Sequence, residues 1–197
     1  MAKHDFQHID ITETEVKSFV SLLLGDFEPN FGERVGRMVY DNDLYIIALG
    51  LATEREKLLL PAADQAKVAF RAAYALEYAF FINQEHFISK CIHAFIESFS
   101  LTKNRSAHRH FGKIMTTLLQ TKRLILNPEQ AMSVAEAAAS WLADPKSKVA
   151  VQIWTLKILS LLAPQVEWVT EILPDVIALL SLHPTPAMEV TLRQKFL

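Results

Sequence analysis

Histidine and cysteine are the residues of this sequence whose spacing could create a metal site or a nucleophile. His4 and His8 are four residues apart, a spacing that puts two imidazole nitrogens on one helix face. His108 and His110 are two residues apart and would point about 200° away from each other on a helix, so they cannot share an ion. The first pair lies in an N-terminal stretch that we expect to be frayed. The sequence therefore predicts no metal site.

Motifs of nucleophilic and phosphate-transfer catalysis are missing from the sequence. It contains no G-x-x-x-x-G-K-S/T, G-x-G-x-x-G or G-x-S-x-G motif, and its five glycines leave little material for a phosphate-binding loop. The single cysteine, Cys91, lies in the apolar stretch ISKCIHAFI and is expected to be a core residue rather than a nucleophile. We therefore predict a protein that is not an enzyme and has no cofactor.

Charge is distributed unevenly along a chain whose formal net charge is only −2. Residues 1–60 contain 11 acids and 6 bases, whereas residues 98–128 contain 6 bases and no acid. This segment could be a landing patch for an acidic partner. The alternatives are a solvated face or an intramolecular match to the acidic N-terminal third. The bases are Lys103, Arg105, Arg109, Lys113, Lys122 and Arg123.

Helices must position these side chains, because apolar residues recur three and four positions apart in nearly every segment. No stretch alternates as a half-buried strand would, and most of the eight prolines separate one periodic run from the next. We predict one all-α domain over residues 1–197, with residues 1–10 frayed. The expected helices span 12–25, 31–41, 44–59, 64–82, 84–99, 105–121, 128–142, 146–163, 165–182 and 186–196.

Several helix starts carry a capping signal. Thr12 with Glu15 has the spacing of a capping box, and Asn127 precedes a first-turn proline. Asp144 stands before Pro145 in the same order and predicts the start of the next helix. Pro174 is the exception, because it falls inside a predicted helix.

An internal repeat emerges when the predicted second helices of successive pairs are aligned. Val68, Ala107, Val149 and Val190 occupy one register, at spacings of 39, 42 and 41 residues. The segment from Ile172 to Arg193 resembles a HEAT repeat: a helix with an early proline, a proline-rich loop, and a helix that opens with an acid and a valine. The resemblance covers residues 60–197 well and 11–60 weakly. It implies a short armadillo-type α-solenoid of about five helical pairs; an irregular helical bundle is the alternative.

The same resemblance implies a binding surface, since second helices of HEAT repeats line the surface that grips partners. One position before the repeat valine, and three and six after it, define a ridge beside the core face. The alternative is that these residues only form the solvent-exposed polar face that any helix packed between two apolar neighbours needs. The ridge residues that we expect to bind a partner are Lys67, Arg71, Tyr74, His110, Lys113, Lys148, Gln152 and Arg193.

Three tryptophans, Trp141, Trp154 and Trp168, lie on consecutive predicted helices. An aromatic cluster could stack a flipped base, and some HEAT-like proteins are alkylpurine DNA glycosylases. Those proteins use a strongly basic groove, which a sequence pI near 6.4 does not favour. Core packing is the simpler expectation for these side chains.

The sequence thus predicts a cytoplasmic, non-catalytic protein-interaction scaffold or adaptor built from HEAT-like repeats. Its partner is expected to be another protein, with no membrane association. The alternative is a nucleic-acid-binding or base-excision protein of the same fold.

Overall fold

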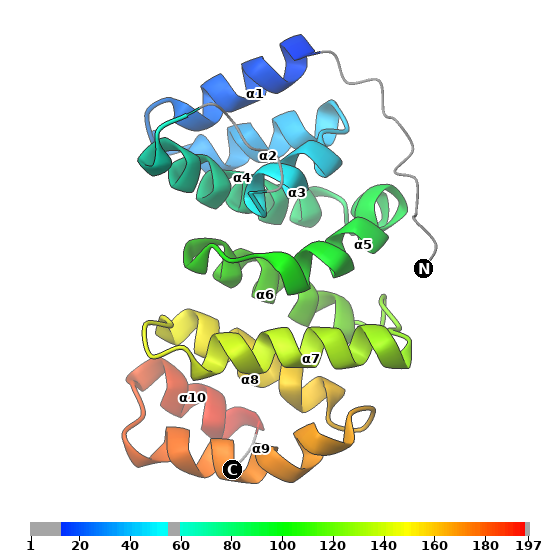
Figure 1. The fold of residues 1–197 in the computed structure, drawn as a ribbon, viewed down its shortest axis with the longest axis vertical. Coiled ribbons are helices and arrows are strands. Elements are labelled where there is room, and N and C mark those ends of the chain that lie inside the picture. The colour runs from blue at the N-terminus through cyan, green and yellow to red at the C-terminus, as the bar shows by residue number, and fades with distance from the viewer. Residues whose placement is uncertain (1–12, 55–59, 196–197) are drawn as a thin grey trace.

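The computed structural model describes residues 13–54 and 60–195, and within them it contains ten helices and no strand. The number and the order of the helices match the sequence prediction, so the all-α fold class is confirmed (Figure 1). The helices are α1 (Glu13–Leu24), α2 (Phe31–Asp41), α3 (Tyr45–Ala52), α4 (Ala62–Ile82), α5 (Gln84–Leu101), α6 (Arg105–Gln120), α7 (Pro128–Ala143), α8 (Val149–Leu162), α9 (Glu167–Leu182) and α10 (Pro186–Lys195).

Two predicted boundaries are wrong by more than a residue or two. Helix α3 ends at Ala52, because Glu54 has a positive φ of 58°, which takes the chain out of the helical conformation. Helix α8 begins at Val149 instead of residue 146. The Asp144 carboxylate accepts from the Lys146 amide and shapes a separate turn, so it does not cap α8.

Two other local predictions are confirmed. The Asn127 side chain accepts from the Gln130 amide, and the Gln130 side chain accepts from the Asn127 amide in return, which makes a capping box at α7. Pro174 lies inside α9 as expected. The predicted box at Thr12, the pair His4 and His8, and the frayed segment 1–10 lie outside the described residues.

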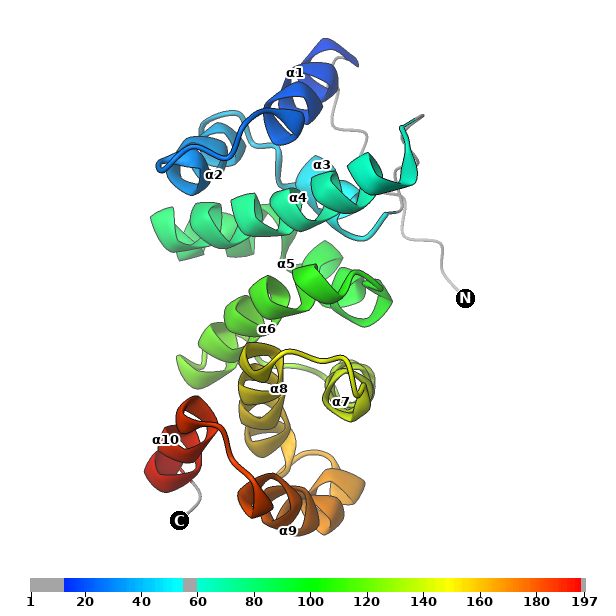
Figure 2. The same ribbon diagram turned by 90° about the vertical axis from the view of Figure 1, so that its left-hand side faces the viewer.

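The helices form two rows. Helices α2, α4, α6, α8 and α10 contact one another in that order, and α3, α5 and α7 form a second row beside them. Figure 2 shows α6, α8 and α10 on one side of the molecule and α5 and α7 on the other. Helix α1 packs on α4 and α2 at one end, and α9 packs on α8 and α10 at the other.

The core is continuous from α1 to the start of α9. A chain of rings in edge-to-face or tilted contact runs through its centre, from Phe80 through Phe87 and Phe95 to Phe111. A second, smaller cluster of fully buried side chains, made by Leu156, Met188 and Leu192, joins α8 to α10. The last helices are therefore held by their own small core.

The positions aligned by the sequence repeat become less buried toward the C-terminal end of the chain. Val68 and Ala107 are buried, Val149 is half-buried, and Val190 is exposed while its neighbours Met188 and Leu192 face inward. The apolar position aligned in the sequence thus has no single environment in the structure.

Candidate functional site

One face of α4 holds five long side chains, at residues 67, 71, 74, 78 and 81. Their spacing of three and four residues places them in a single row along the helix. The first two, Lys67 and Arg71, turn toward α1. The other three, Tyr74, Tyr78 and Phe81, are aromatic and form the centre of the candidate site.

Lys67 and Arg71 bind the C-terminal end of α1. Lys67 Nζ donates to the Leu24 carbonyl at 2.7 Å, and Arg71 Nη1 donates to the carbonyls of Leu23 at 2.7 Å and Gly25 at 2.5 Å. Cations are favourable there, because the last carbonyls of a helix are unpaired and carry partial negative charge. Arg71 is buried, and this burial lowers its pKa. Both side chains are therefore committed to contacts within the chain.

Two glycines of α2 let the tyrosines of α4 lie directly on that helix. A Cβ atom on Gly32 would lie 2.6 Å from Tyr78 Cε2 and 2.9 Å from Tyr74 Cε1, and one on Gly36 would overlap Tyr78 Cβ. The two phenol oxygens are 3.4 Å apart. This hydrogen bond, followed by burial, raises the pKa of Tyr74 to about 12, so its phenol is neutral at physiological pH.

Four aromatic residues on this side of the molecule, of which Tyr74 is half-buried and the others are exposed, make up what we call the aromatic platform: Phe27, Tyr74, Tyr78 and Phe81. The Phe27 and Tyr74 ring centroids are 6.0 Å apart, and those of Tyr74 and Tyr78 are 5.0 Å apart. Phe27 is 55% exposed and Phe81 is 45% exposed. The Arg71 guanidinium lies 5.3 Å from the Phe27 ring centroid and makes a cation–π contact with that ring. Contiguous exposed aromatic side chains of this kind are typical of interaction sites.

Helix α6 borders the platform with two cations. Lys113 Nζ lies 4.6 Å from the centre of the Phe81 ring and donates to Glu77 Oε1 at 2.5 Å. Arg109 is exposed. Its positive charge lowers the pKa of the Tyr74 phenol, but by less than the Tyr78 hydrogen bond and burial raise it. A partner on the platform would therefore meet the rings and, beside them, the exposed guanidinium of Arg109, because the charge of Lys113 is balanced by Glu77.

A buried hydrogen bond joins α4 to α6, next to Lys113. His110 Nδ1 donates to Glu77 Oε2 at 2.6 Å, and both side chains are almost completely buried. Burial raises the pKa of Glu77, but the hydrogen bonds from His110 and Lys113 outweigh it, so the net pKa is lowered. Glu77 is therefore ionised at neutral pH and fixes the position of Lys113.

The structure brings together five of the predicted ridge residues but not all eight. Lys67, Arg71, Tyr74, His110 and Lys113 lie along α4 and the adjacent face of α6. Of these, Arg71 and His110 are buried and face other parts of the chain. The remaining three lie elsewhere in the same row of helices: Lys148 is exposed at the start of α8, Gln152 is half-buried on α8, and Arg193 pairs with Glu189 on α10.

The basic segment is partly neutralised within the chain. Arg105 pairs with Asp144, and Arg123 Nη1 lies 3.0 Å from Glu85 Oε1. These acids come from α5 and the end of α7, and not from residues 1–60, as the intramolecular alternative would require. Lys103, Arg109 and Lys122 are exposed. Within their described bounds α6 and α8 contain no acid, whereas α7 and α9 contain no lysine or arginine.

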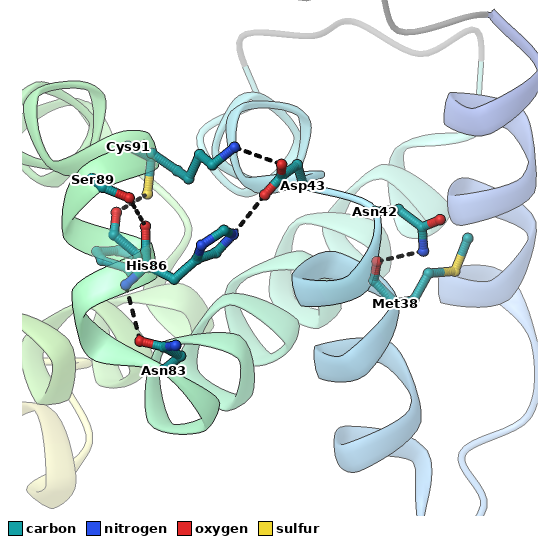
Figure 3. Close-up of polar contacts among 9 residues, drawn as sticks. Met38, Asn42, Asp43, Asn83, His86, Ser89 and Cys91 are labelled. Atoms are coloured by element: carbon teal, nitrogen blue, oxygen red, sulfur yellow. Dashed lines mark hydrogen bonds and ion pairs between the residues drawn. The ribbon is translucent and has the colours of Figure 1, made fainter.

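A second polar cluster joins the loop after α2 to α5 (Figure 3). The Asp43 carboxylate accepts from His86 Nε2 at 2.7 Å and from Lys90 Nζ at 2.6 Å. Burial raises the pKa of Asp43, but these hydrogen bonds outweigh it and lower the net value. Nearby Cys91 donates to the Phe87 carbonyl, and burial raises the pKa of its thiol well above the usual value. The cluster thus contains no activated nucleophile and serves to fasten the loop.

The three tryptophans lie in three different interfaces. Trp141 stacks on His108 with centroids 4.0 Å apart, Trp154 packs over Gly112, and Trp168 Nε1 donates to the sulfur of Met132. No two of these indole rings are in contact in the part of the chain that the structure describes. Their arrangement supports packing roles and does not form a base-stacking pocket.

Sequence reasoning missed Phe27, Tyr78, Phe81 and Glu77. The signal was present, because Tyr74, Tyr78 and Phe81 share one helix face and Gly32 and Gly36 are spaced to lie beneath them. Among the described residues no cluster of three or more His, Cys, Asp and Glu side chains could hold a metal ion. No helix in the described ranges is long and apolar enough to span a membrane.

Comparison with known proteins found no protein-family model, no curated protein and no solved structure that matches the chain.

Proposed function

We propose that the chain is a protein-interaction module, a non-catalytic scaffold or adaptor, that binds a partner polypeptide at the aromatic platform. The observation that carries the proposal is the row of rings formed by Phe27, Tyr74 and Tyr78, with the exposed ring of Phe81 one turn further along α4 and with Arg109 and Lys113 on the adjacent helix α6. Aromatic and arginine side chains supply much of the binding energy in protein interfaces, because they bury large areas with few rotatable bonds.

The arrangement of the helices supports a HEAT-like solenoid as the scaffold. The row α2, α4, α6, α8 and α10 contains the second helix of each expected pair, and α4 and α6 of this row present the platform and its cations. The single cysteine is a free thiol in the core, as is usual in a reducing compartment, and we propose that the protein acts in the cytoplasm.

Single-stranded nucleic acid is the second candidate, since stacked rings beside cations also suit unpaired bases. The structure favours it less, because Lys67, Arg71, Arg105 and Arg123 are engaged with carbonyls or acids of the same chain. Few cations are left to neutralise phosphates, and phosphate contacts dominate nucleic-acid affinity.

The test is affinity capture from a lysate of the source cells with the double variant F27S/F81S. Both rings are about half exposed, so we expect the variant to keep the circular dichroism spectrum of the wild type and to lose only part of its thermal stability through the contacts of Phe27 with Phe31 and Arg71. I125S is the matched control, because Ile125 is 89% exposed but lies in the loop after α6. A partner protein retained by wild type and I125S and lost by F27S/F81S supports the proposal.

Two results would overturn the proposal. One is recovery of the same proteins by wild type and F27S/F81S. The other is binding of labelled single-stranded DNA or RNA that weakens steeply with salt and depends on Phe27 and Phe81, which would establish the second candidate.

A further inference from the structure

Helix α9 exposes an apolar stripe at the end of the molecule opposite to α1. Leu179 is 69% exposed and Leu182 is 67% exposed, and Ile172 lies on the same side of the helix. The three residues are spaced by seven and three positions, which aligns them along one face. Only Val169 of this helix is fully buried.

Helix α7 of the same chain can be compared with α9, to see which residue types occur on the outer face of a helix in this fold. Both helices have 16 residues, so aligning their first residues pairs every position. The inward positions agree: Val134, Ala138 and Trp141 of α7 correspond to Leu173, Ile177 and Leu180 of α9, and all six are buried or half-buried.

The outward positions of the two helices differ in chemistry. Where α9 has Leu179 and Leu182, α7 has Ser140 and Ala143, and all four side chains are exposed. Ile172 corresponds to Ser133, which is half-buried and hydrogen-bonded to Ser100 of α5, so the comparison of outer faces rests on the other two positions. Large apolar side chains at these positions are therefore not required to pack the helix on its neighbours. Their exposure to water is unfavourable unless another surface covers them.

Acidic side chains flank the stripe. Glu167, Glu171 and Asp175 are exposed on α9, which contains no lysine or arginine. None of the three forms an ion pair with another described residue, since the ion pairs of the described chain lie elsewhere. The stripe thus combines leucines at the C-terminal half of the helix with uncompensated negative charge toward its N-terminal half.

We propose that this α9 surface binds a basic amphipathic helix of a partner protein. Leucines of the partner at positions i, i+3 and i+7 would cover Leu179 and Leu182, as amphipathic helices do in other helix-binding proteins. Its lysines or arginines would pair with Glu171 and Asp175. A symmetric contact between two α9 helices fits less well, because α9 contains no lysine or arginine that could pair with the acids of the other copy. This surface is separate from the aromatic platform and does not rest on the function proposed there.

The probe is a labelled synthetic peptide of about 18 residues, long enough to form roughly five helical turns. It carries leucines on one face and lysines on its flanks. Two control peptides keep the length: one scrambles the leucines around the helix, and the other replaces each lysine with glutamate. Binding to the full chain is measured by fluorescence polarisation at low and moderate salt.

The variant L179S/L182A gives α9 the residues of α7 at these two outward positions. It is expected to weaken binding of the leucine–lysine peptide about tenfold or more, with unchanged circular dichroism, because both side chains are mostly exposed. E171Q/D175N removes the two charges without introducing new ones, and is expected to weaken binding and to remove most of its salt dependence. I125S should bind as the wild type does.

Three results would overturn the proposal. The scrambled or the glutamate peptide could bind as tightly as the leucine–lysine peptide. Binding could be unaffected by L179S/L182A. Finally, sedimentation could show a wild-type dimer that L179S/L182A converts to a monomer, which would make a second copy of the chain the occupant.

Discussion

The junction between α4 and α6 and the pair formed by α9 and α10 are built from similar helices but stabilised differently. Helix α4 contacts α1, α2, α3, α5 and α6, so it is covered on most sides and is exposed mainly along the platform. Helix α9 contacts only α8 and α10 strongly. The first region buries a carboxylate, Glu77, that is hydrogen-bonded to His110, whereas the second exposes leucines.

This difference shows how the number of neighbours sets the local chemistry. A helix that is covered on several sides excludes water, and a buried polar group there must find its partner inside the protein. A helix at the end of a stack has a small core and opens at low free energy. The two regions are therefore expected to respond differently to comparable substitutions.

The largest effect is expected from E77A. Removing the carboxylate leaves His110 buried without its partner and frees Lys113, and breaking a buried pair in this way should lower the free energy of unfolding by about 4 kcal/mol. Urea denaturation followed by circular dichroism measures the change. The matched variant in the other region, E171A, removes an exposed acid and should change stability by less than about 0.5 kcal/mol.

The same carboxylate predicts a pH dependence. The folded pKa of Glu77 lies below its ordinary value of 4.5, so its contribution is fully present above pH 4.5 and is lost as the pH falls through the folded value. E77A should therefore lose less stability than the wild type on acidification. Equal losses would show that Glu77 does not stabilise the folded state as an anion.

The second prediction concerns the contact between α2 and α4. G36A places a methyl group where Tyr78 Cβ already lies, against the α4 backbone, and should cost about 3 kcal/mol because two helices must separate. G25A is the control: the nearest atom to a Cβ there is the Leu22 carbonyl oxygen at 3.3 Å, and Gly25 is exposed. Equal stability of the two variants would mean that α2 does not lie as close to Tyr78 as described.

Sequence patterns predicted local structure well, because helix periodicity, prolines and the Asn127 cap act within a few residues. They failed where the partner is distant in the chain. Arg71 and His110 look like members of a solvated ridge, but their partners are the carbonyls of Leu23 and Gly25 and the carboxylate of Glu77, between 33 and 48 residues away. Spacing along one helix cannot reveal which polar side chains face another helix.

The third prediction tests whether the end pair opens independently. L192A removes part of the small cluster between α8 and α10 and should lower hydrogen-exchange protection of α10 by about 2 kcal/mol. Amides of α4 should keep their protection. L76A, in the buried face of α4, should instead weaken every slowly exchanging amide. If L192A reduced protection in α4 and α10 equally, the two regions would unfold as one unit.

The smallest loss of stability is expected from D43N. This variant tests whether an ion pair near the surface contributes less than the buried contact of Glu77. Asp43 lies in the well-packed half but near the surface, and its backbone φ of 53° is a conformation that asparagine tolerates. The substitution removes the charge that His86 and Lys90 contact without forcing the loop to change. Exposed ion pairs contribute little, so the loss should be about 0.5 kcal/mol and should shrink at high salt. D41N, two residues earlier on an exposed acid, is the control for charge alone. A loss for D43N as large as that for E77A would mean that the loop contact, and not the burial of α4, stabilises this half of the molecule.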